Sequence, residues 1–165
     1  MKWSELKDGT VVCKTMTTET AHRLIDYSGK CASIHGHSYK WEVTAALETR
    51  DTLPNGISID FGHLKKAMRA CIYDVYDHAL VLADIDPLLE NEDLLRFAAD
   101  GTEQKIVRFA GNPTAENFAR HTAVVLCEYY EQRPRAWRHI DIIRVRVWET
   151  ANSYGQYQEA GPSNF

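Results

Sequence analysis

Residues 31–48 read CASIHGHSYKWEVTAALE, and this stretch decides what kind of fold the chain forms. Between Ser38 and Glu48, apolar residues occupy the odd positions and polar residues the even ones. That alternation is typical of a β-strand with one buried face and one face in water. His35 and His37 share the parity of the buried residues, so we expect both imidazoles to point toward the interior.

Two imidazoles on one face of a strand can hold a single metal ion, and His22, at the end of another strand-like segment, offers a third. Three histidines without an obvious fourth ligand are typical of a catalytic zinc (Zn²⁺) that keeps one coordination position open. Gly36 lies between the two histidines, and we expect any side chain at this position to crowd the backbone. The alternative is a polar edge strand that binds no metal.

Cys31 lies in a polar loop beside Lys30, ahead of the histidine pair. A neighbouring cation favours the thiolate, which is the form that acts as a base or nucleophile. The alternative is that Cys31 is simply a small buried apolar residue, as many free cysteines are.

The pattern along the rest of the chain predicts one α+β domain spanning residues 1–165. Strands are expected at 10–21, 38–48, 140–149 and 153–159, and helices at 61–78, after the capping residue Asp60, and 114–131. This order, ββααββ, favours an antiparallel β-sheet with two helices on one face. The segment 84–111 is less regular, although Leu88-Leu89 and Leu94-Leu95 indicate a short helix.

Composition excludes several classes of function. The net charge is −4, which argues against a nucleic-acid-binding surface, and no segment is apolar enough for a membrane span or a signal peptide. The four cysteines form no CxxC pair. We therefore expect reduced thiols and a cytoplasmic protein with neither nucleic acid nor membrane as a partner.

Carboxylates supply the remaining candidates. Asp77-His78, at the end of the first predicted helix, is either an acid–base pair or a favourable helix-terminus charge. Direct contact between the two requires the helix to have ended there, and Asp74 competes as a partner for His78. Glu149 ends the apolar face of strand 140–149, so its carboxylate must be paired, capped or used. Glu116 either serves the start of the second helix or contacts a ligand.

Several segments, taken in order, resemble the family of 6-pyruvoyltetrahydropterin synthases and bacterial 6-carboxytetrahydropterin synthases. They are Ala21-His22-Arg23-Leu24, Cys31 with His35-Gly36-His37-Ser38-Tyr39, Ile59-Asp60-Phe61 with Leu64-Lys65, Asp77-His78, Pro113-Thr114-Ala115-Glu116-Asn117, and Glu149-Thr150. One departure is Thr18, where many members carry a phenylalanine.

The resemblance implies a role for each candidate. His22, His35 and His37 would bind zinc, Cys31 would be the general base, and Asp77 with His78 would relay protons. Glu149 would be catalytic and would anchor the pterin ring, with Thr114 and Glu116 also contacting substrate. Arg23, Lys30, Lys65 and Lys66 are candidates to meet a triphosphate.

The resemblance also implies the tunnelling fold (T-fold), in which sheets from several subunits close into a β-barrel. Active sites would lie between protomers, and the usual assembly is a homo-hexamer built as a dimer of trimers.

The implied reaction converts 7,8-dihydroneopterin triphosphate to 6-carboxy-5,6,7,8-tetrahydropterin, with loss of acetaldehyde and triphosphate, in 7-deazaguanine (queuosine) biosynthesis. The short loop from Cys31 to His35 favours this lyase over the 6-pyruvoyl branch, which keeps all the carbons for biopterin. A non-catalytic pterin-binding protein of the same fold and a cupin-type oxygenase are the competing hypotheses.

Overall fold

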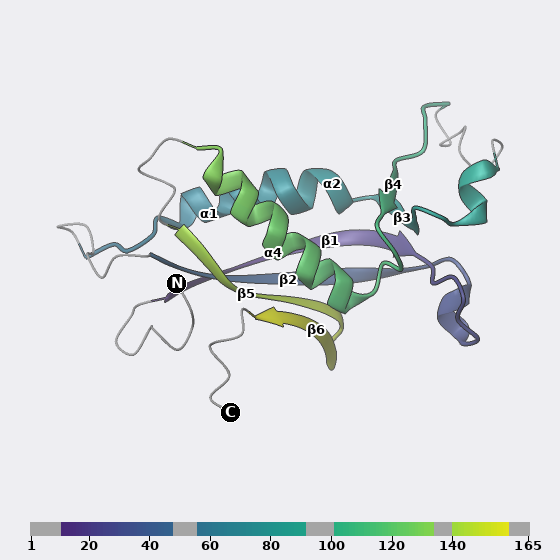
Figure 1. Ribbon diagram of the computed structural model, residues 1–165, viewed down its shortest axis with the longest axis horizontal. Coiled ribbons are helices and arrows are strands. Elements are labelled where there is room, and N and C mark those ends of the chain that lie inside the picture. Colours follow the sequence, from purple (N-terminus) through teal and green to yellow (C-terminus); the bar gives the residue numbers. More distant parts are fainter. Residues whose placement is uncertain (1–10, 48–55, 92–100, 134–139, 159–165) are drawn as a thin grey trace.

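The computed structural model describes residues 11–47, 56–91, 101–133 and 140–158, which form a curled sheet with helices laid across one face (Figure 1). The sheet has six strands in the order β4-β3-β1-β2-β5-β6. The strands are β1 (Val11–His22), β2 (His35–Leu47), β3 (Ala79–Ala83), β4 (Ile106–Phe109), β5 (Ile140–Thr150) and β6 (Ser153–Gln158). The helices are α1 (Phe61–Met68), α2 (Asp74–Tyr76) and α4 (Ala115–Glu131).

The four strands expected from alternation form the antiparallel part of the sheet. β1 pairs with β2, β2 with β5, and β5 with β6, all antiparallel. The register of the first pair places His22 directly opposite His35. The predicted α+β class is confirmed, and the antiparallel core alone sets the positions of the histidines.

β3 and β4 were not predicted, and the expectation of a purely antiparallel sheet is wrong. β3 lies parallel to the end of β1, with Thr20 opposite Ala79 and His22 opposite Val81, and β4 lies parallel to β3. β3 has the sequence ALVLA, a short and continuously apolar run that follows a helix directly. A strand that is covered on both faces has no polar face, so its sequence shows no alternation of apolar and polar residues by which it could be predicted.

The first helical segment is continuous from Phe61 to Tyr76, with a π-helical stretch at Arg69–Tyr73 between α1 and α2. Asp60 caps its start, since its Oδ1 accepts from the N–H of Gly62 at 2.6 Å. The helix ends at Tyr76, two residues before the expected boundary. Pro87–Glu90 forms a 3₁₀ turn where Leu88-Leu89 indicated a helix, whereas Leu94-Leu95 lies outside the described residues.

The core lies between the sheet and the helices. Tyr39 and Trp41 of β2 are fully buried, and both contact Phe118 of α4 with ring centroids 5.5 Å apart. Thr18 belongs to this core, because its hydroxyl accepts a hydrogen bond from the Trp41 indole N–H at 2.9 Å. A buried indole needs such a partner, which gives a physical reason for a threonine at this position. None of the helices in the described ranges is long and apolar enough to cross a bilayer.

Candidate metal centre and active site

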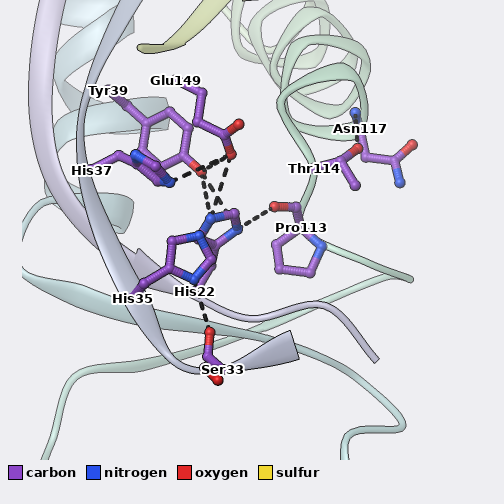
Figure 2. A network of polar contacts seen from close by, with 9 residues as sticks. All are labelled: His22, Ser33, His35, His37, Tyr39, Pro113, Thr114, Asn117 and Glu149. Carbon is purple, nitrogen blue, oxygen red and sulfur yellow. Dashed lines mark hydrogen bonds and ion pairs between the residues drawn. The ribbon is translucent and has the colours of Figure 1, made fainter. Parts of the chain in front are cut away.

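Three imidazoles meet where β1 ends and β2 begins (Figure 2). His22 is the last residue of β1, His35 is the first of β2, and His37 follows on the same face. One nitrogen from each ring lies within 4.8 Å of the other two. The Nε2 atoms of His35 and His37 are buried and have no hydrogen-bond partner among the described residues. Unpaired imidazole nitrogens that face one another in this way can hold a metal ion.

Backbone carbonyls orient two of the rings. His22 Nδ1–H donates to the Pro113 carbonyl at 2.8 Å, and His35 Nδ1–H donates to the Ser33 carbonyl at 2.8 Å. With its proton on Nδ1, each ring presents the Nε2 lone pair to the cluster, which is the tautomer that a metal ligand requires. Burial lowers the pKa of His22, an effect opposed by the hydrogen bond to Pro113 and reinforced by His35. Three neutral imidazoles are a donor set that fits zinc.

Glu149 lies against this cluster. Its Oε1 atom is 3.5 Å from His22 Nε2 and 3.8 Å from His37 Nε2, and it accepts a hydrogen bond from the Tyr39 hydroxyl at 3.0 Å. Burial, followed by the charge and hydrogen bond of Glu149, raises the pKa of Tyr39, so its hydroxyl stays protonated and donates. The carboxylate at the end of the apolar strand is therefore paired, as the sequence required. Tyr39 was predicted only as a core residue.

A cavity of about 240 Å³ adjoins the centre. It brings together the following candidates from the sequence: His22, Cys31, Thr114, Glu116 and Glu149. Two tyrosines, Tyr27 and Tyr154, complete much of its wall. Thr114 also caps α4, because its hydroxyl accepts from the Asn117 N–H at 3.3 Å. A carboxylate, a thiol and a histidine centre around one cavity can bind and deprotonate a small polar molecule.

Cys31 is half-buried in a 3₁₀ turn, Lys30–Ala32. Its carbonyl accepts from the Leu24 N–H at 2.8 Å, which ties the turn to the chain just beyond β1. The side chain lines the cavity that also contains His22 and Glu149.

Asp77 and His78 form a direct pair, with Asp77 Oδ2 2.9 Å from His78 Nδ1. Contact is possible because the helix has ended: Asp77 is extended, and His78 has φ of 53°, a left-handed conformation that is uncommon outside glycine. Both residues are fixed to the backbone of Glu19, whose N–H donates to Asp77 Oδ1 and whose carbonyl accepts from the His78 N–H. Asp74 lies 3.4 Å from Arg69 instead.

The Asp77–His78 pair and Cys31 border different cavities of one chain. His78 lines a second cavity, of about 470 Å³, together with Glu19, His37 and Gln104, and the two cavities share no lining residue. The His78 side chain is 79% exposed. Within one copy of the chain, Cys31 therefore lies beside His22 of the cluster, whereas His78 lies at a separate cavity that His37 also borders.

Two expectations from the sequence need revision. The Arg23 guanidinium, a candidate for the triphosphate, forms an ion pair through Nε and Nη2 with both carboxylate oxygens of Asp86, a residue only 2% exposed. A Cβ at Gly36 would crowd none of the described residues, since it would meet the Thr20 carbonyl oxygen at 3.5 Å and the Ala21 Cα at 4.0 Å, both ordinary contact distances. The close approach occurs at Gly155, where a Cβ would lie 2.3 Å from the Glu116 backbone nitrogen.

A family model described as 6-pyruvoyl tetrahydropterin synthase matches residues 11–160. The chain belongs to this family. Within it, three similar relatives are named 6-carboxy-5,6,7,8-tetrahydropterin synthase. The Rickettsia typhi protein is 37% identical, over 62% of this chain and 70% of the relative. The Haemophilus influenzae protein is 28% identical over 90% and 98%, and the Aquifex aeolicus protein is 28% identical over 96% and 99%.

Solved structures with the same fold extend the comparison. An uncharacterized protein from Wolinella succinogenes superposes with a TM-score of 0.66 at 20% identity, covering 92% of this chain and 98% of that one. The 6-pyruvoyl tetrahydropterin synthase of Caenorhabditis elegans gives a TM-score of 0.61 at 21% identity, covering 92% and 96%. These likenesses establish the T-fold for this chain.

Proposed function

We propose that this chain is a zinc-dependent 6-carboxy-5,6,7,8-tetrahydropterin synthase. Its substrates would be 7,8-dihydroneopterin triphosphate and one water, and acetaldehyde and triphosphate would leave as the 6-carboxyl product forms, in 7-deazaguanine (queuosine) biosynthesis. The observation that carries the proposal is the cluster of three imidazole nitrogens beside a cavity that His22 of this cluster lines together with Cys31 and Glu149. The names of the relatives and the short loop from Cys31 to His35 support the carboxy branch.

Zinc is proposed as the metal because three neutral imidazoles with an adjoining cavity suit a catalytic site of this ion. When bound, zinc would supply Lewis acidity, which makes a substrate hydroxyl easier to deprotonate. His22, His35 and His37 would hold it through their Nε2 atoms. The carbonyls of Pro113 and Ser33 keep two of those rings in the required tautomer.

The remaining residues of the cavity would bind the pterin and move its protons. Cys31 would take the proton from the side chain of the substrate, as a thiolate near the centre. Glu149 would accept hydrogen bonds from the aminopyrimidine edge of the pterin and fix its register, while Tyr39 holds the carboxylate. Thr114 and Glu116 would contact the substrate from the start of α4.

Assembly would complete the site. Because Cys31 and His78 line different cavities of one chain, the proposed relay would pair Cys31 with His78 from a second copy. A homo-hexamer built from two trimers, with the sheets closed into a barrel, would supply that copy. We propose this assembly for the single domain of residues 1–165, acting in the cytoplasm on a small molecule without nucleic acid or membrane.

The direct test is to incubate the zinc-loaded protein with 7,8-dihydroneopterin triphosphate and to measure acetaldehyde, triphosphate and pterin products. We expect acetaldehyde and 6-carboxytetrahydropterin in equal amounts. Triphosphate release without acetaldehyde would instead indicate the 6-pyruvoyl reaction. Binding of a dihydropterin with no turnover would indicate a non-catalytic protein.

Glu149 needs a separate experiment, because it lies near both the pterin cavity and the metal centre. Glu149→Gln keeps the shape of the side chain and removes its charge. If Glu149 anchors the pterin, the variant retains stoichiometric zinc and its KM for the substrate rises. Loss of zinc from the variant would show instead that the carboxylate is a metal ligand, and the anchoring role would be discarded.

A further inference from the structure

Asn112 makes an unusual pair of contacts with the chain just beyond β1. Its side-chain Oδ1 accepts from the N–H of Ile25 at 2.9 Å, and its Nδ2 donates to the carbonyl of Ile25 at 2.9 Å. One amide side chain therefore satisfies both backbone groups of a residue that follows the last sheet-paired position, His22.

The two contacts close a small ring around His22. From His22 the chain runs to Ile25, crosses to Asn112 through the paired hydrogen bonds, and continues to Pro113. The carbonyl of Pro113 then accepts from His22 Nδ1 at 2.8 Å. Proline has a fixed φ, which restricts the direction of the peptide unit that orients the imidazole.

Other contacts make this ring rigid. The Asn112 carbonyl accepts from the Thr114 N–H and from the Asn117 side chain, both at 2.9 Å, which fixes Asn112 to the start of α4. On the opposite side, the Leu24 N–H donates to the Cys31 carbonyl. The ring therefore joins the first turn of α4, the end of β1 and the turn that carries the thiol.

We infer that Asn112 is a positioning residue of the zinc centre, which sets the direction of His22 Nε2 by holding the Pro113 carbonyl on His22 Nδ1. The inference rests on the zinc centre proposed above but not on the substrate. Without the Asn112 side chain, the peptide of Pro113 is no longer fixed to the chain that follows His22. The ring of His22 then samples both tautomers and a wider range of orientations, and the metal loses a preorganised ligand.

The first test compares zinc affinity, by competition with a chromophoric chelator, in the wild type, Asn112→Ala and the control Gln156→Ala. Gln156 also forms a side-chain amide hydrogen bond, with Arg146 at 2.6 Å, but it lies on β6 outside the ring. We expect Asn112→Ala to bind zinc about 10-fold more weakly, as is usual when groups that orient a ligand are removed. The control should bind as the wild type does.

Two further measurements separate positioning from general stability. In the zinc-free protein, ¹⁵N NMR should show His22 as one tautomer, protonated at Nδ1, in the wild type and as a mixture in Asn112→Ala. In a His22→Gln background, Asn112→Ala should change zinc affinity by less than about twofold, because the group through which Asn112 acts is gone.

Unchanged zinc affinity in folded Asn112→Ala would overturn the inference, and so would an equal loss of affinity in the His22→Gln background.

Urea titration of the zinc-free proteins identifies the conditions in which all are folded. If Asn112→Ala does not fold, Asn112→Asp replaces it, since it keeps an acceptor for the Ile25 N–H and replaces the donor with a charged oxygen that the Ile25 carbonyl repels. A single His22 tautomer in that variant would equally contradict the inference. No readout uses the pterin, so failure of the proposed reaction leaves the test intact.

Discussion

Gly155→Ala should be severely destabilising, because β6 passes unusually close to the start of α4 at this residue. A Cβ added there would lie 2.3 Å from the Glu116 nitrogen, 2.4 Å from the Ala115 carbonyl carbon and 2.7 Å from its oxygen. All three atoms belong to the backbone, so no side-chain rotation can relieve the overlap. The strand and the helix would have to separate by about 1 Å to restore ordinary contact, and overpacking of this kind costs about 3 kcal/mol or more.

Urea unfolding at neutral pH measures this loss, and Gly36→Ala is the matched control. Gly36 also lies in a strand, but its added Cβ would make only ordinary contacts, with the Thr20 oxygen at 3.5 Å and the Ala21 Cα at 4.0 Å, so we expect a change within about 0.5 kcal/mol. Separation of β6 from α4 would also move Ser153 and Tyr154, which line the cavity beside Glu149. If Gly155→Ala unfolds within about 1 kcal/mol of the wild type, the close packing of β6 on α4 is refuted.

Other predictions concern the thiol, the ligands and a buried ion pair. Cys31→Ala should retain zinc yet lose acetaldehyde production, because it removes the base and spares the imidazoles; normal turnover would mean that Cys31 is misassigned. His35→Ala should lose zinc and activity together, which metal analysis alongside the same assay can establish. Arg23→Ala should lower the free energy of unfolding by about 3 kcal/mol at pH 7, because it leaves the buried Asp86 carboxylate unpaired. The hydrogen bond from Arg23 holds the pKa of Asp86 below 3.8, so the wild type loses this stability as pH falls below about 4. The gap between the two proteins in urea unfolding should therefore narrow from pH 7 to pH 3.5, and a constant gap would contradict the assignment.

The sequence predicted the parts of the fold that have a regular period. Alternation located β2 and β5, and the expected strands at 10–21 and 153–159 match β1 and β6 within a few residues. The capping residue Asp60 marked the start of the first helical segment correctly. It failed for β3, where a short apolar run carries no period. It also placed the end of the first helix too late, because the residues up to His78 continue a plausible helical pattern while the Glu19 backbone holds Asp77 and His78 outside it.

The candidate site was likewise predicted only where the sequence has a regular pattern. Spacing and parity indicated the histidine pair, since residues two apart on a strand share a face. No pattern could indicate the Pro113 carbonyl on His22 or the Asn112 amide on Ile25, because these contacts join segments about 90 residues apart. The ion pair between Arg23 and Asp86 was missed for the same reason. It joins the chain just after β1 to the chain just after β3, and the pairing of β1 with β3 was not predicted.

The pairing of β1 on both sides gives the centre two regions of unequal mobility. At Thr20–His22 the strand is hydrogen-bonded to β2 along one edge and to β3 along the other, so freeing His22 requires the sheet itself to part. Cys31, by contrast, lies on a single 3₁₀ turn outside the ladder, where amide exchange and local opening require far less free energy. An ion held by the three histidines would therefore stay bound through many openings of the turn beside it, and solute entry would not require metal loss.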